Sequence, residues 1–143
     1  MQISQLLRRK GPAVATVQAT ASVRDALALL AEHGIGALVV SADGERIDGI
    51  LSERDIARGL HERGAGLLGD PVSSVMTAEV HTCPPTASVH ELAQTMTDHR
   101  IRHVPVVDEG RLVGIVSIGD VVKARLDELE SERAQLVDYI QSV

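Results

Sequence analysis

Aromatic residues and cysteine are almost absent from this chain of 143 residues. Tyr139 is the one residue among Phe, Trp and Tyr, and Cys83 is the one cysteine. A core must therefore be aliphatic, and binding of single-stranded nucleic acid, which relies on aromatic stacking platforms, is disfavoured. A single cysteine excludes an internal disulfide and fits a reducing compartment, so we expect a cytoplasmic protein.

Long apolar runs are also missing. No segment approaches the roughly 18 apolar residues of a membrane-spanning helix. The basic cluster Arg8–Lys10 is not followed by the apolar stretch of a secretory signal. The net charge of -6 is unfavourable for a phosphate-backbone partner. We therefore expect no membrane contact, and nucleic-acid binding is the least favoured function.

The sequence that is present repeats itself. TASVRDAL at 20–27 matches TASVHEL at 86–92, and GILSERDIA at 49–57 matches GIVSIGDVV at 114–122. Upstream, ISQLL at 3–7 matches VSSVM at 72–76. Three matches in the same order and at nearly the same spacing indicate a duplication.

Both copies predict one β-α-β-β-α order. Ser22 and Ser88 are N-cap residues of amphipathic helices, and Ser52 and Ser117 begin the second helix of each copy. Asp43-Gly44 and Glu109-Gly110 are predicted hairpin turns. The predicted strands cover 14–17, 37–41 and 47–51 in the first copy, and 80–83, 103–107 and 111–116 in the second.

One copy has too little chain to cover its own sheet. We therefore expect a mixed α/β (α+β) fold in which tandem repeats pack with pseudo-twofold symmetry. The predicted units are a first repeat with an N-terminal helix, a Gly-rich linker, a second repeat and a helical tail. They span residues 1–63, 64–71, 72–126 and 127–143.

Each copy joins a strand to a helix through Ser-x-x-Asp, at Ser52–Asp55 and Ser117–Asp120. One interpretation is a capping box that satisfies free N–H groups at the helix start. The other is a binding site, in which the helix N-terminus receives a phosphate and the carboxylate accepts hydrogen bonds from a ribose. Arg54 would add a cation, and Gly119 would allow close approach to the backbone. The two interpretations are compatible.

The duplicated unit, with RHVPVVD at 102–108, resembles a CBS-domain pair, the Bateman module, over residues 3–126. That resemblance implies paired β-α-β-β-α units that bind adenosine-containing ligands between the copies. It implies that Asp55 and Asp120 hold ribose hydroxyls, with Ser52 and Ser117 beside the ribose or phosphate. Further implied contacts are Thr16 and Thr82 on the first strands, Arg102 and His103 for phosphate, and Ile35, Ala37, Val104 and Pro105 around adenine.

The two copies are not equal. Gly36-Ala37 stands where the second copy has Arg102-His103, and Gly119 stands where the first has Arg54. We infer two unlike sites, which bind different ligands or of which only one binds well.

Other chemistry finds little support. His99 and His103 do not share a helix face as zinc ligands would, and Cys83 has no catalytic partner in the sequence. Neither a dinucleotide fingerprint nor a Walker motif occurs. We expect a non-enzymatic protein with no obligatory cofactor and no metal.

The tail carries a heptad seam formed by Val122, Leu126, Leu129, Leu136 and Ile140, interrupted by Arg133. Self-association is favoured, and folding back along the domain is the alternative. The main functional hypothesis is a regulatory sensor of AMP, ADP, ATP or NAD that signals to an unidentified partner protein. The alternative is a ligand-independent assembly module.

Overall fold

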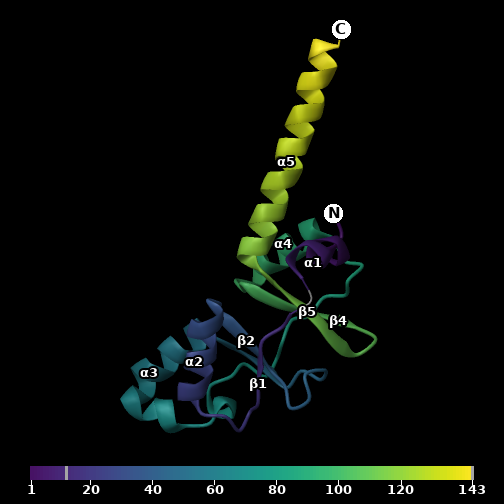
Figure 1. Cartoon of the computed structure of the whole chain (residues 1–143). Coiled ribbons are helices and arrows are strands. Elements are labelled where there is room, and N and C mark those ends of the chain that lie inside the picture. Colours follow the sequence, from purple (N-terminus) through teal and green to yellow (C-terminus); the bar gives the residue numbers. More distant parts are fainter. Residues whose placement is uncertain (12, 143) are drawn as a thin grey trace.

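The computed structural model describes residues 1–11 and 13–142, and Figure 1 shows a body with one long helix that projects from it. The first half contains α1 (Ile3–Lys10), β1 (Thr16–Val17), α2 (Val23–His33), β2 (Ala37–Val40), β3 (Gly49–Ser52) and α3 (Glu53–Arg63). In its sheet, β1 lies parallel to β2 and β2 lies antiparallel to β3. The mixed α/β fold with tandem repeats is therefore confirmed.

The second half repeats this order with a smaller sheet. Its elements are α4 (Val89–His99), β4 (His103–Asp108), β5 (Arg111–Ser117) and α5 (Ile118–Gln141), and β4 pairs antiparallel with β5. The turn between them has positive φ at Glu109 and Gly110, 50° and 78°. This conformation matches the type I′ turn typical of two-residue hairpins.

The strand predicted over 80–83 is wrong as a strand. Only Cys83 forms a bridge, parallel to Val106, with hydrogen bonds to Pro105 and Val107. Pro105 of β4 has no N–H with which to extend the pairing from Cys83 towards Val80, and Pro84 and Pro85 cannot extend it in the other direction. The first strand of the other repeat is likewise short, covering Thr16–Val17 within the predicted 14–17.

The predicted N-caps are confirmed. The hydroxyls of Ser22 and Ser88 accept hydrogen bonds from the backbone N–H three residues later, and α2 ends at Gly34 in the left-handed conformation. The other two serines form complete capping boxes, as described below. Satisfied N–H groups at four helix starts explain why each helix begins where the sequence predicts.

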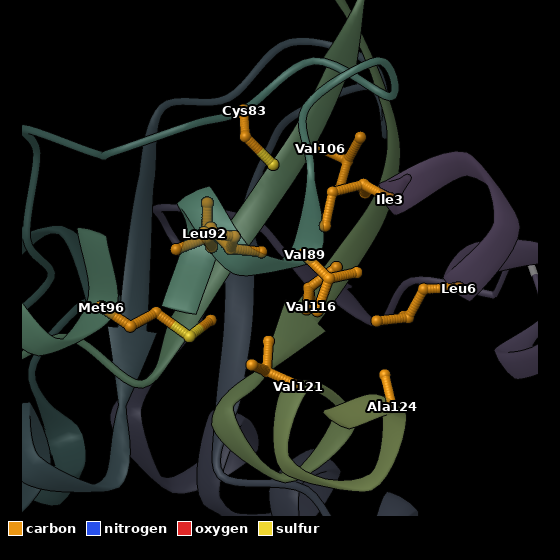
Figure 2. Packing of buried hydrophobic residues seen from close by; sticks show 11 residues of the cluster. Ile3, Leu6, Cys83, Val89, Leu92, Met96, Val106, Val116, Val121 and Ala124 are labelled. Atoms are coloured by element: carbon orange, nitrogen blue, oxygen red, sulfur yellow. The ribbon is translucent and has the colours of Figure 1, made fainter. Parts of the chain in front are cut away.

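Each repeat has its own hydrophobic core, and the two halves exchange segments between them. Ile3 and Leu6 of α1 are buried among Val89, Val106 and Val116 of the second repeat (Figure 2). Backbone hydrogen bonds from the N–H of Ile3 to the carbonyl of Ala87 and from Val89 to Met1 fix this contact. The helix predicted to open the first repeat therefore packs in the core of the second.

The reverse exchange involves the segment predicted as a linker. Residues Gly64–Gly69 form the 3₁₀ helix η1, and Val72–Ser74 form η2. Leu67 and Val72 are fully buried in the core of the first repeat with Val23 and Leu51. The connection between the repeats is thus a packed part of the first core. In both repeats, the segment that precedes the repeat in sequence packs in the core of the other repeat.

The last helix, α5, is continuous from Ile118 to Gln141 and does not fold back (Figure 1). Its base packs through Val121 and Ala124, while Leu126, Leu136 and Ile140 are exposed. Within the described residues, none of the helices is both long enough and apolar enough to cross a membrane.

Candidate functional site

A cleft of about 500 Å³ lies between the two repeats. The first repeat contributes the end of β3 and the first turns of α3. The second contributes the end of α4, the start of β4 and the segment before Cys83. The lining residues are Gly36, Ile50, Ser52, Glu53, Arg54, Asp55, Arg58, Thr77, Glu79, Val80, His81, His99, Arg100, Ile101, Arg102 and His103.

The Ser52–Asp55 capping box forms one wall of this cleft. The hydroxyl of Ser52 accepts a hydrogen bond from the Asp55 N–H at 3.2 Å, and the Asp55 carboxylate accepts one from the Ser52 N–H at 2.9 Å. The other carboxylate oxygen accepts a hydrogen bond from the Thr77 hydroxyl of the second repeat at 3.2 Å. Asp55 is therefore a cap, and it also lies at the seam between the halves.

Positive and titratable side chains gather around this carboxylate. The cleft lining includes four arginines and three histidines, against three carboxylates. All four arginines are exposed, so their guanidinium groups remain accessible to a ligand. The rings of His81 and His99 lie with centroids 4.4 Å apart. The groups that favour an anion are, by number, Arg54, Arg58, Arg100, Arg102, His81, His99 and His103.

His103 is the most buried of these basic groups. Burial of its imidazole and the charge of Lys10 lower its pKa, while Glu53 and Asp120 oppose that shift. Near neutral pH the imidazole is consequently biased towards its uncharged form. An anion bound beside it would favour the charged form instead.

In the second repeat, the equivalent carboxylate, Asp120, pairs with a lysine side chain. Asp120 forms the same capping box with Ser117, but its carboxylate also accepts a hydrogen bond from Lys10 Nζ at 2.6 Å. Lys10 donates a second one to the carbonyl of Ile115 at 2.8 Å. Burial raises the pKa of Asp120, but the bonds from Lys10 and Ser117 outweigh it, and the net shift is downward.

The sequence-predicted residues divide into two groups. Ser52, Arg54, Asp55, Arg102 and His103 line the cleft. The other nine do not, and three of the four residues expected around adenine are buried. The nine are Thr16, Ile35, Ala37, Thr82, Val104, Pro105, Ser117, Gly119 and Asp120. Ile50, Val80 and Ile101 provide the apolar part of the lining instead.

Several cleft residues were not found from the sequence. Arg58 lies one turn after Arg54 on α3, a spacing that places both on one helix face. That spacing in the sequence could have identified Arg58 as a further cation beside Arg54. Arg100 ends α4 with a positive φ of 54°, and its carbonyl receives a 3.5 Å hydrogen bond from Arg54. Thr77, Glu79 and His81 follow η2 without any local motif.

Other reactive chemistry is weak in the described residues. They contain no cluster of three or more His, Cys, Asp or Glu side chains that could hold a metal ion. Burial raises the pKa of the Cys83 thiol to about 11, so the reactive thiolate is scarce at neutral pH.

Comparisons with known proteins decide the family. The family model of the CBS domain matches residues 4–62 and 72–127. The chain belongs to the CBS-domain family. The resemblance to a CBS-domain pair is thereby confirmed, and the cleft lies between two CBS repeats.

Individual CBS proteins are similar over most of the chain. The mitochondrial CBS domain-containing protein CBSX3 of Arabidopsis thaliana is 40% identical over 124 residues, 84% of this chain and 60% of that protein. The chain thus spans less than two thirds of this relative. The crystal structure of the CBS-domain containing protein ATU1752 from Agrobacterium tumefaciens shares 45% identity with a TM-score of 0.84, covering 87% and 99% of the two chains.

Several similar structures contain a ligand. The CBS domain protein PAE2072 from Pyrobaculum aerophilum, complexed with AMP, shares 34% identity with a TM-score of 0.78 over 92% of this chain and 99% of that one. An adenosine-containing ligand is therefore found in a stand-alone CBS pair of this fold.

Proposed function

We propose that this chain is a regulatory, non-enzymatic module that binds an adenine nucleotide in the cleft beside Asp55. The observation that carries the proposal is the convergence of both repeats on one cavity with a carboxylate at a helix start and an excess of basic groups. A cavity of about 500 Å³ falls within the ~300–1,000 Å³ typical of small-molecule sites. The similar CBS pair in complex with AMP supports the class of ligand.

Asp55 is the proposed ribose contact. Its carboxylate has two oxygens and several acceptor positions, and the described contacts are from Ser52 and Thr77. An ionised carboxylate can accept further hydrogen bonds from a ribose diol. Ser52 lies at the same helix start, where N–H groups and the helix dipole favour an anion. Ile50, Val80 and Ile101 would contact the base.

The arginines would bind the phosphates. Guanidinium groups pair with phosphate oxygens in two-pronged fashion, and exposed arginines pay little desolvation before binding. With Arg54, Arg58, Arg100 and Arg102 around one cavity, affinity should grow with phosphate number. The proposed preference is therefore ATP and ADP over AMP, with NAD as a further candidate.

The sites of the two repeats are proposed to be unequal. Asp55 faces an open cleft, whereas Asp120 is neutralised by Lys10. Ser117, Gly119 and Asp120 would form a second site only if Lys10 withdrew. We expect the wild-type chain to bind one nucleotide.

Binding would change the packing between the repeats, because the cleft is made from both. A partner protein would read that change as a shift between two populations. The chain is proposed to act as a homodimer in the cytoplasm, and its single, buried cysteine fits a reducing compartment.

A titration of AMP, ADP, ATP and NAD into the protein, followed by calorimetry, tests the proposal. Affinity should rise from AMP to ATP, and Arg58→Gln should weaken ATP more than AMP. Arg46→Gln, in the first hairpin and outside the cleft, is the matched control and should leave both affinities unchanged. Thermal unfolding gives a second readout, because ligand at 100 times its Kd adds ~2.7 kcal/mol of stability. Absence of heat and of any thermal shift with all four ligands would favour the assembly module.

A further inference from the structure

The exposed side of α5 carries an apolar stripe that is interrupted once, at Arg133. Large side chains that are 50–70% exposed follow one another at the heptad spacing of a coiled coil. They are Val122 at 51%, Leu126 at 62%, Leu129 at 50%, Leu136 at 63% and Ile140 at 70%. A stripe of this length and exposure is unusual for a protein that works as a monomer.

The body of the molecule packs on the other side of this helix. Val121 and Ala124 are buried in the second core, and the ion pairs to Arg9 and Met1 come from Asp127 and Glu128. None of these belongs to the stripe. The fold therefore leaves the stripe free from the base of α5 to its tip, as the projecting helix in Figure 1 allows.

The tip itself needs support. Beyond Glu128, every described residue of α5 is exposed, and no ion pair or hydrogen bond within the described chain ties this part to the body. Residues 129–141 thus gain no burial from the body, and their helix rests on local propensity and on continuity with the packed base of α5. A partner helix would supply the missing burial.

We propose that two copies of this chain pair through α5 as an antiparallel coiled coil centred on Ser131. In this register Val122 faces Ile140 of the second copy, and Leu126 faces Leu136. This pairing matches four of the five large residues of the stripe with one another, and Leu129 faces Arg133. It rests on the proposed homodimer and adds its interface and orientation.

The charge pattern selects the orientation. In a parallel pair, Arg133 would face Arg133 of the second copy within the core, an unfavourable layer. In the antiparallel register Arg133 faces Leu129 and lies next to Glu130 of the second copy. Each Arg133 then lies beside Glu130 of the other copy and offsets the repulsion between the two Glu130 carboxylates. The two Glu132 carboxylates also meet, at a solvent-exposed edge where repulsion is screened.

The orientation also separates the bodies. A helix of 24 residues is about 36 Å long, so antiparallel tails hold the two CBS pairs at opposite ends. The nucleotide clefts of both copies then remain open to solvent and to partners.

Sedimentation equilibrium of the full chain measures the association. The expected mass is twice 15.2 kDa. Leu129→Asp should weaken the dimer at least tenfold, while Gln135→Asp, on the outward face of the same helix, should not. A mass of one chain at tens of micromolar would overturn both the homodimer and the register. A dimer that Leu129→Asp leaves intact would overturn the role of α5 as the interface, but not the homodimer itself.

Oxidative cross-linking reports the orientation. Glu130→Cys should form a disulfide-linked dimer, because position 130 meets its own equivalent only in the antiparallel register. Ile140→Cys should not, since its equivalent lies at the far end of the pair. The wild-type chain, with Cys83 buried, is the control and should stay unlinked. Linkage through position 140 and not through 130 would mean a parallel pair and contradict the proposal.

Discussion

Lys10 Nζ lies 2.6 Å from Asp120 Oδ2, across 110 residues of sequence. The equivalent carboxylate, Asp55, receives the hydroxyl of Thr77 at 3.2 Å instead of a cation. The two carboxylates thus belong to equivalent capping boxes, but Asp55 accepts a hydrogen bond from a neutral hydroxyl and Asp120 accepts one from a charged amine. This difference is the structural basis for expecting unequal ligand sites.

Lys10→Met should raise the pKa of Asp120 from its lowered value, because the largest hydrogen bond that lowers it is lost. The folded pKa of Asp120 is depressed, so its contribution to stability is present above the unfolded pKa and is lost as pH falls through the folded value. The variant should therefore lose less stability between neutral and acid pH than the wild type. Carboxyl NMR titration measures the pKa directly. Arg46→Gln, an exposed arginine of the first hairpin, should leave it unchanged.

His103 should couple nucleotide binding to pH. Burial lowers its pKa, so the folded state binds the proton less readily than the unfolded state. Stability should accordingly fall as pH drops below about 6.5, the ordinary histidine value. A bound phosphate reverses the preference, so nucleotide affinity should rise over the same range. Calorimetry at several pH values, with His103→Gln as the comparison, isolates this contribution. An identical pH dependence in the variant would contradict it.

Ile3→Ala should destabilise the second repeat, although Ile3 stands at the start of the chain. The side chain is fully buried in that core, and such truncations cost about 2–5 kcal/mol. Hydrogen exchange should show the loss of protection in β4 and β5 before β2 and β3. Arg8→Ala, on the exposed side of α1, should have little effect.

Gly49→Ala should destabilise the fold and weaken nucleotide binding together. A Cβ at this position would lie 2.8 Å from the Thr77 carbonyl and 2.8 Å from Met76 Sδ. The Thr77 backbone cannot give way, because it pairs with Ile50 and positions the hydroxyl on Asp55. A cost of about 1–3 kcal/mol is expected from overpacking. Gly66→Ala, where a Cβ meets nothing within 4 Å, is the control.

Local signals in the sequence were sufficient for the repeat and its helix starts. Serine followed by an acid at the third position specifies a cap whatever the tertiary context, so Ser52 and Ser117 were placed correctly. The strand at 80–83 failed because of its partner strand. The β-like run Val80–Cys83 suggested a ladder, but Pro105 of β4 has no N–H with which to extend the pairing from Cys83 towards Val80.

What the sequence did not predict depends on contacts between distant segments. The pattern of α1 predicts an amphipathic helix but not which core covers Ile3. Arg100 enters the cleft because a left-handed residue ends α4 opposite Arg54, 46 positions away. Likewise, nothing near Asp120 in sequence indicates that Lys10 reaches it. The sequence predicted the part of the site at the helix start of the first repeat, and the family resemblance supplied Arg102 and His103. The other residues that the second repeat contributes to the cleft were not predicted.

Calorimetric titration of ATP into Asp55→Ala and Asp120→Ala tests the central claim most directly. Both substitutions break the same type of capping box, so each controls for the structural effect of the other. The account predicts one nucleotide per wild-type chain, a loss of at least about tenfold in affinity for Asp55→Ala, about 1.4 kcal/mol, and near wild-type affinity for Asp120→Ala. Equal losses in the two variants, or an unchanged affinity in Asp55→Ala, would contradict it.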